Sequence, residues 1–257
     1  MTKNEQLDFL ISELSPATVI PPETERKWQL FRALVNVREP DSISDGFLAM
    51  QDKLLQSLIA ERGITDIDDL RPVRDSLYLW RGDITALKIG AIVNAANNGM
   101  LGCFIPHHDC IDNAIHTFSG VQLRIECAAI MEKQGHLEPT GQAKITSAYN
   151  LPSNNILHTV GPIVDMEVTS QHRRLLASCY RSCLAMADEN HITSIAFCCI
   201  STGEFRFPND EAARIAIDTV TDQQKSCVYV NKVIFNVFKD KDAHIYRGIL
   251  SENKASG

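Results

Sequence analysis

Three potential metal ligands lie close together near the middle of the chain, at Cys103, His108 and Cys110. Cysteine thiolates and neutral imidazoles suit a tetrahedral zinc ion, and three protein ligands leave the fourth coordination position open, as a catalytic metal requires. We therefore predict that these side chains bind one zinc ion per chain. A closed structural site usually takes four protein ligands, and because Asp109 is a candidate for the fourth, that alternative stays open.

His107 is the competing imidazole. Because a turn after Pro106 can direct either ring inward, the residue types alone do not decide between His107 and His108. Either ring would bind in its neutral form, and the two cysteines would bind as thiolates, since metal coordination lowers the pKa of a thiol.

Carboxamide and carboxylate side chains flank this cluster. Asn94 and Asn97 precede it, and a carboxamide can both donate to and accept from a diol. Asp112 follows it, and a carboxylate there could position or deprotonate a water molecule. The alternatives are structural, because asparagine-rich turns are common and Asp112 could also be the N-cap of a following helix.

Two further loops carry residues that suit ligand binding. Asp83, in Gly82-Asp83-Ile84-Thr85, could accept a hydrogen bond from an amine, or it could be an N-cap. The segment 201–208 begins with Ser-Thr-Gly, and such small residues let consecutive backbone amides surround an anion. It is not a Walker loop, because no Gly-Lys-Ser/Thr sequence occurs, and an ordinary turn is the alternative.

The pattern of the surrounding chain predicts a layered α/β fold that positions these loops. Short apolar strands alternate with helices after residue 69, which is typical of a largely parallel sheet. We expect strands at 76–80, 90–94, 143–149, 156–160, 194–200 and 232–238, with helices near 110–118, 121–134, 171–189, 209–225 and 241–249. All three loops then follow strands, and ligands bind at the carboxyl ends of strands in such sheets.

Composition excludes several classes of function. The formal net charge of −7, from 25 basic and 32 acidic side chains, argues against nonspecific nucleic-acid binding. The sequence contains neither a signal peptide nor an uninterrupted apolar run long enough to span a membrane, so we expect a cytoplasmic protein with no membrane partner. Eight cysteines in such a protein are expected to be reduced thiols or metal ligands rather than disulfides.

Taken together, the three loops resemble those of the macrodomain family, which binds ADP-ribose in a three-layer α/β/α fold with a central mixed, largely parallel sheet. The motifs occur in the family's order, and the resemblance spans roughly residues 76–248. The Cys-x4-His-x-Cys insertion and the helical N-terminal extension are similar to a zinc-dependent microbial branch, encoded beside a sirtuin-type ADP-ribosyltransferase. The spacing in that branch favours His108 as the ligand.

This resemblance implies a domain organisation and a set of site residues. The expected parts are a helical N-terminal extension at 1–75, a macrodomain at 76–250 and a loose tail at 251–257. Asn97 and Asp112 are the expected catalytic residues. The expected contacts to ADP-ribose are Asp83, Ile84, Asn97, Ser201, Thr202, Gly203, Glu204 and Phe205. Arg206 stands where many relatives have glycine, so the resemblance does not establish the detailed path of that loop.

The activity implied by the resemblance is zinc-dependent hydrolysis that removes mono-ADP-ribose from a modified protein, with an ester to aspartate or glutamate as the expected linkage. A non-hydrolytic reader of ADP-ribose and an ADP-ribose-1″-phosphatase are the alternatives. The expected partners are a mono-ADP-ribosylated protein, a sirtuin-type ADP-ribosyltransferase and a lipoyl-carrier protein of the glycine-cleavage H type. The N-terminal helices would either dock that substrate or extend the core.

Overall fold

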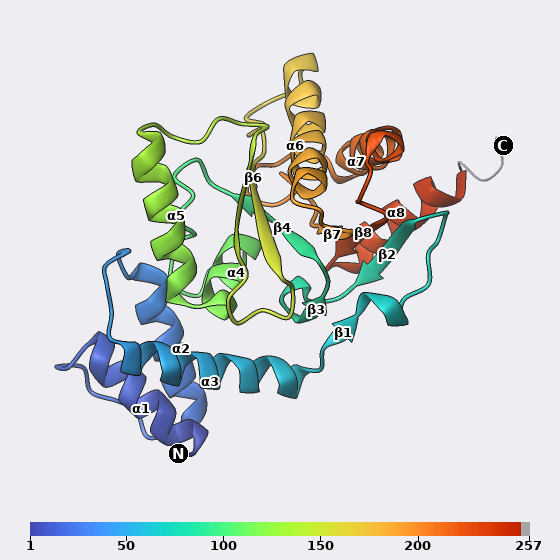
Figure 1. Cartoon of the computed structure of the whole chain (residues 1–257). Helices are drawn as coiled ribbons and strands as arrows, with labels where there is room; N and C mark the ends of the chain where they lie inside the picture. Colours follow the sequence, from blue (N-terminus) through green and yellow to red (C-terminus); the bar gives the residue numbers. More distant parts are fainter. Residues whose placement is uncertain (253–257) are drawn as a thin grey trace.

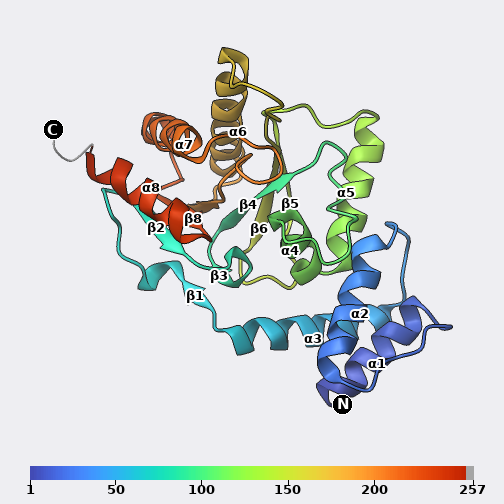
Figure 2. The same cartoon turned by 180° about the vertical axis from the view of Figure 1, so that it is seen from behind.

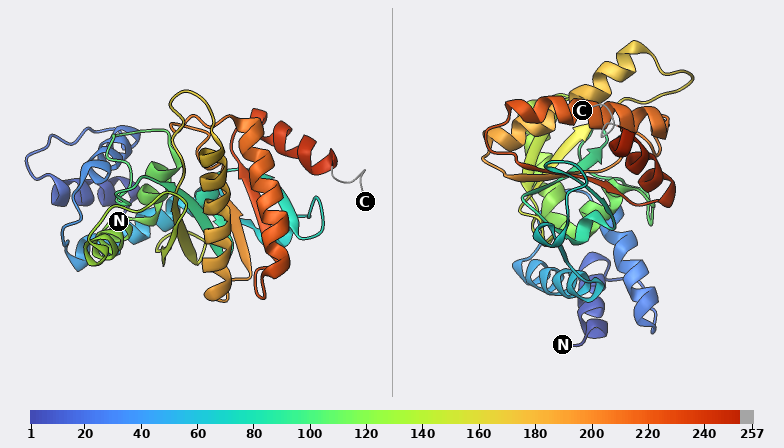
Figure 3. Two further views of the ribbon diagram at one scale, coloured as in Figure 1. Left: turned by 90° about the horizontal axis from the view of Figure 1, so that it is seen from above. Right: turned by 90° about the vertical axis from the view of Figure 1, so that its right-hand side faces the viewer.

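The computed structural model describes residues 1–252, and its centre is a six-stranded sheet in the order β2-β8-β7-β4-β6-β5 (Figure 1). All neighbouring strands pair in parallel except β5, which is antiparallel to β6. Helices α6 and α7 lie together on one face, and α4 lies on the other (Figure 3). The expected three-layer α/β/α fold with a mixed, largely parallel sheet is therefore confirmed.

The predicted strands are all present, with ends that differ by a few residues at most. They are β2 Leu77–Arg81, β4 Ala91–Ala96, β5 Ala143–Ser147, β6 Asn155–Val160, β7 Ser194–Phe197 and β8 Lys232–Val237. Two strands that we did not predict, β1 Thr65–Asp66 and β3 Leu87–Lys88, pair with each other in a separate short sheet. With two residues each, they are too short to produce a recognisable apolar alternation.

The predicted helices are present as well. They are α4 Ile111–Ser119, α5 Val121–Gln134, α6 Ser170–Glu189, α7 Asn209–Gln223 and α8 Asp240–Glu252, with 3-10 turns at Ile67–Asp69, Ile84–Ala86 and Gln224–Ser226. Helix α8 continues two residues into the tail that we expected from residue 251, and Ser251 Oγ donates a hydrogen bond to Arg247 O. The remainder of that predicted tail, 253–257, lies outside the described residues.

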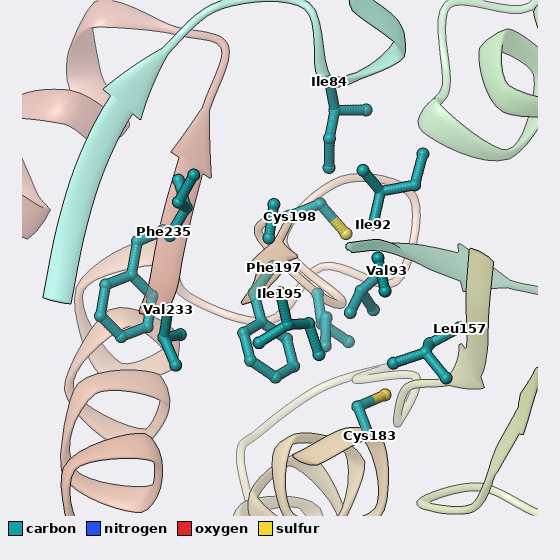
Figure 4. Close-up of a cluster of buried hydrophobic side chains, with 14 of the residues drawn as sticks. Ile84, Ile92, Val93, Leu157, Cys183, Ile195, Phe197, Cys198, Val233 and Phe235 are labelled. Atoms are coloured by element: carbon teal, nitrogen blue, oxygen red, sulfur yellow. The ribbon is translucent and has the colours of Figure 1, made fainter. Parts of the chain in front are cut away.

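The main core lies between the sheet and its helices. Strands β4, β7 and β8 are buried along nearly their whole length, as expected for strands covered on both faces. Figure 4 shows Val93, Ile195 and Phe235 in this cluster, together with Cys183 of α6. A sheet fixed in this way gives the loops at its carboxyl edge a rigid base.

The first part of the chain forms three helices, α1 Lys3–Leu14, α2 Thr24–Val37 and α3 Asp45–Arg62, which lie beside α4 and α5 (Figure 2). Their apolar faces form a second core with Val121 of α5. Leu55 and Ile59 of α3 belong to the main core, so the extension and the sheet domain share buried surface. Among residues 1–252, no helix is both long and apolar enough to cross a membrane.

Candidate functional site

Two of the predicted site loops begin where adjacent strands end. Strand β4 ends at Ala96, directly before Asn97, and β7 ends at Phe197, shortly before the loop 201–208. Because these two strands are parallel neighbours, both loops leave the same edge of the sheet. Their side chains approach each other there, with Glu204 Oε1 3.6 Å from His108 Nε2.

The three predicted metal ligands lie together in the segment between β4 and α4. Their ligand atoms all lie within 4.8 Å of one another, and Cys103 Sγ is 3.3 Å from His108 Nδ1. Cys110 is the N-cap of α4, where its Sγ accepts a hydrogen bond from Asn113 N. Two thiols and one imidazole at this separation fit a zinc ion with one coordination position left open.

The structure separates the two histidines. His107 adopts a left-handed backbone conformation with φ of 58°, and its N–H donates to Asn36 Oδ1 over 3.2 Å. Among the described residues, neither His107 nor Asp109 joins the group formed by Cys103, His108 and Cys110. The geometry therefore favours His108 as the imidazole ligand and gives no support to Asp109 as a fourth.

Burial disfavours the thiolate form of Cys110 in the absence of a cation. Burial raises the pKa of its thiol to about 12, and the neighbouring Cys103 and Asp112 act in the same direction. A bound divalent cation reverses this preference, because its charge stabilises the thiolate. Metal binding at this site would therefore release protons.

Asp112 lies buried between two asparagine side chains. Asn94 Nδ2 donates to one carboxylate oxygen over 2.8 Å, and Asn97 Nδ2 lies 3.3 Å from the other. Burial raises the pKa of Asp112 to about 6, although the hydrogen bonds from both asparagines and the charge of Arg124 act against this rise. Asp112 is therefore held in one orientation, and its pKa lies above the ordinary value for an aspartate.

Asn97 fixes the chain before the metal ligands as well. Its Nδ2 donates to Gly102 O over 2.9 Å, and its Oδ1 accepts from Gly99 N over 2.9 Å. Gly102 has φ of +81°, and a Cβ there would lie 2.7 Å from Cγ of His116. Only glycine satisfies both conditions, so the chain entering the metal segment passes directly over the His116 ring.

Two neutral histidines lie behind Asp112. Burial lowers the pKa of His158 to about 3 and that of His116 well below its usual value. His158 bonds to Asn94 Nδ2 and Thr146 Oγ1, so it is a satisfied core residue. His116, His158 and Cys127 lie within 4.8 Å of one another, but with both nitrogens of His158 engaged they do not offer three free ligands.

Asp83 forms an N-cap in this structure. Its Oδ1 accepts from both N and Oγ1 of Thr85, at the start of the 3-10 turn Ile84–Ala86, and Arg62 Nη1 donates to its Oδ2 over 3.1 Å. The side chain stays 39% exposed, so a ligand can still reach it. Ile84 is buried in the main core (Figure 4), and its contact with a ligand would come from its backbone.

The loop 201–208 leaves several backbone amides available to an anion. Thr202 N bonds to Cys199 O, and Arg206 N bonds to Gly203 O. Within residues 1–252, no hydrogen bond involves the N–H groups of Gly203, Glu204 or Phe205. Ser201 and Arg206 have φ of 65° and 56°, so the arginine accepts the left-handed backbone for which glycine is the usual residue.

Comparisons with known proteins identify the family of this chain. The family model of the Macro domain matches residues 93–216. A relative from Treponema medium, named protein-ADP-ribose hydrolase, is 51% identical over 261 residues that cover 98% of this chain and 100% of that protein. The chain belongs to the macrodomain family.

Two further macrodomain relatives extend the comparison. A Staphylococcus aureus (strain MSSA476) protein, also named protein-ADP-ribose hydrolase, is 48% identical over 250 residues, which cover 94% of each chain. The crystal structure of the Trypanosoma brucei macrodomain in complex with ADP-ribose is 29% identical, with a TM-score of 0.66, and covers 85% of this chain and 94% of that one.

Sequence reasoning missed the residues that join the N-terminal helices to the site of this macrodomain. Arg62 contacts Asp83, and Arg32 and Asn36 contact the segment that holds the metal ligands. Arg32 and Asn36 are four positions apart, so they share one face of α2, and polar residues within an otherwise apolar helix face were the available signal. Nothing in their spacing indicated which loop these side chains would contact.

Proposed function

We propose that this chain is a zinc-dependent protein-ADP-ribose hydrolase that removes mono-ADP-ribose from protein side chains, with an ester to aspartate or glutamate as the bond cleaved. The observation that carries this proposal is the position of Asp112, two residues after Cys110 and held by Asn94 and Asn97. The hydrolase class is supported by relatives about half identical to this chain over nearly its whole length.

The ADP-ribose moiety would lie along the carboxyl edge of the sheet. Asp83 would accept a hydrogen bond from the adenine amino group, with Ile84 contributing backbone contacts. The backbone N–H groups of Gly203 and its neighbours would bind the diphosphate. Ser201, Thr202 and Glu204 belong to the same loop and would add further contacts to it. Phe205 would pack against the distal ribose. These contacts would position the substrate, and the reaction would take place beside the metal ligands.

There, Asn97 would orient the distal ribose and Asp112 would position or deprotonate the attacking water. Cys103 and Cys110 would hold zinc as thiolates, and His108 would hold it through its imidazole. When bound there, zinc would supply Lewis acidity for the reaction. The Asn94 and Asn97 amides keep Asp112 in one orientation for this role.

The test measures release of ADP-ribose from an ester-linked mono-ADP-ribosylated protein, with zinc-loaded enzyme and with chelator-treated enzyme. The Cys103→Ala variant is expected to lose both metal and activity. Cys227→Ala is the matched control, since Cys227 is a half-buried thiol that bonds to Gln223 O outside the site. If the Cys103→Ala protein lost its metal and kept full activity, zinc would not take part in the reaction.

The same assay separates the other candidate functions. A reader would bind the modified protein and release nothing, and an ADP-ribose-1″-phosphatase would release phosphate from its own substrate with little release from protein. The sirtuin-type transferase and the lipoyl-carrier substrate are proposed from the family resemblance. They are tested by modifying a lipoyl-carrier protein with such a transferase and offering it to this enzyme beside an unrelated ester-linked substrate.

A further inference from the structure

We propose that Asn36 and Arg32, on the N-terminal helix α2, are positioning residues that hold the metal loop, residues 101–110, in the shape that binds zinc. This inference rests on the metal site in the proposed function and extends it to the N-terminal helices. Its consequence is that the extension at 1–75 forms part of the site. Hydrogen bonds from α2 and α5 cross to this loop.

Asn36 is the central contact. It is 1% exposed, its Oδ1 accepts the His107 N–H, and its Nδ2 donates to Thr117 Oγ1 over 3.0 Å. His107 has the left-handed backbone, an uncommon conformation for a residue other than glycine. Because Asn36 binds the backbone amide of that residue, it stabilises the turn that brings His108, rather than His107, beside Cys103.

Arg32 holds the next part of the same loop. Its Nη2 lies 3.3 Å from His108 O and 3.0 Å from Asn113 Oδ1. Asn113 in turn donates to Ile105 O through Nδ2 and to Cys110 Sγ through its backbone N–H. Arg32 and Asn113 together therefore tie the backbone between residues 105 and 108 to the thiol at the start of α4.

Arg124 of α5 fastens the beginning of the loop to the same helix. Its Nε donates to Leu101 O over 2.6 Å, and its Nη1 donates to Val35 O over 3.1 Å. Its guanidinium also lies 4.3 Å above the ring of Phe104. The loop is thus tied to α2 at both ends, directly through Asn36 and Arg32 and indirectly through Arg124.

These bonds matter because a loop that is already ordered pays less entropy when the metal binds. The ligand pair Cys103 and His108 is separated by four residues that include no regular helix or strand. Hydrogen bonds that orient metal ligands typically change metal affinity by about 10- to 100-fold when removed. If α2 only covered the core, substitutions in it would lower the stability of the fold and leave the zinc affinity unaltered.

The experiment measures zinc affinity by competition with a chromophoric chelator, and thermal unfolding of the metal-free protein, for full-length variants. Asn36→Leu is compared with Gln51→Leu. Gln51 is also 1% exposed and also accepts a backbone N–H, from Val121, but it contacts α5 rather than the metal loop. Arg32→Ala is compared with Arg26→Ala, an exposed position on the same helix that pairs with Glu23.

Asn36→Leu and Arg32→Ala are expected to raise the zinc dissociation constant about 10-fold or more. Gln51→Leu and Arg26→Ala are expected to keep the wild-type value, even where Gln51→Leu lowers the unfolding temperature. Wild-type affinity in both loop-contacting variants would overturn the inference, and so would an equal loss in Gln51→Leu. Wild-type protein that binds no zinc would instead overturn the proposed metal site, and this inference with it. Arg32 is partly exposed, so Arg32→Ala keeps the test valid if Asn36→Leu does not fold.

Discussion

Asn94 Nδ2 donates a 2.8 Å hydrogen bond to Asp112 Oδ1, although the two residues lie 18 positions apart in the sequence. The bond joins the end of β4 to the start of α4 across the metal loop. Asn94 also bonds to His158, which fixes the carboxamide from behind. The carboxylate therefore has one orientation. The proposed zinc ligands precede it in the sequence, the last of them by two residues.

Replacing Asp112 should separate catalysis from metal binding. Asp112→Ala is expected to lower hydrolysis about 100-fold or more, because it removes the group proposed to position the water, and to leave the zinc content unchanged. The measurement pairs turnover with metal analysis on the same preparation. Asp109→Ala is the control, since Asp109 lies outside the ligand group. Full activity in Asp112→Ala would exclude the proposed role.

Gly102→Ala should disturb the metal loop through a steric clash. Its φ of +81° and the 2.7 Å approach of a Cβ to His116 both oppose a side chain. Gly135→Ala isolates the backbone contribution, because Gly135 has φ of +73° and open space around its Cβ position. Urea unfolding is expected to show a loss of about 1 kcal/mol for Gly135→Ala. Gly102→Ala should lose more and also bind zinc less tightly, and equal losses in the two variants would contradict the clash.

Asp83→Asn should distinguish the N-cap from the adenine contact. Asparagine is as good an N-cap as aspartate, so the free energy of unfolding is expected to change by less than about 1 kcal/mol. The negative charge that would face the adenine amino group is lost, and we expect the dissociation constant for ADP-ribose to rise about 10-fold, as for the loss of one charged hydrogen bond. Isothermal titration with ADP-ribose measures it. An unchanged affinity would leave Asp83 with the cap role alone.

The buried histidines should make the fold sensitive to acid. The pKa of His158 in the folded state is about 3, below its ordinary value, so the stability it contributes is complete above about pH 6.5 and is lost as the pH falls towards 3. At pH 5 the lowered pKa of His158 reduces the free energy of unfolding by about 2 kcal/mol relative to its value above pH 6.5. Burial shifts the pKa of His116 in the same direction.

Asp112 opposes this trend, because its pKa is raised to about 6 and its protonation relieves the cost of burial below that pH, by about 1 kcal/mol at pH 5. The net expectation for metal-free protein is lower stability at pH 5 than at pH 7, measured by urea unfolding. His158→Gln should reduce the difference, whereas His244→Gln, at an exposed position on α8, should not. A pH-independent midpoint in the wild-type protein would contradict the prediction.

The sequence by itself determined the strands of the main sheet, its helices, and the residue types of the proposed metal ligands. The alternation of apolar runs with helical segments located every strand of the main sheet, because a strand covered on both faces is a short continuous apolar run and a helix shows its single buried face in the local spacing. The grouping of Cys103, His108 and Cys110 was likewise visible, since all three lie within one short segment. The two short strands were not, because two residues carry no periodicity.

Only the tertiary structure decided how those residues are held. The turn at His107 has a partner in Asn36, which lies 71 positions away and accepts the His107 N–H, and the environment of Asp112 depends on Asn94 and on burial. The ion pair between Arg62 and Asp83 joins α3 to the loop after β2. Contacts of this kind form when distant elements pack against one another. Local sequence spacing therefore does not indicate which distant residue a buried polar group will contact.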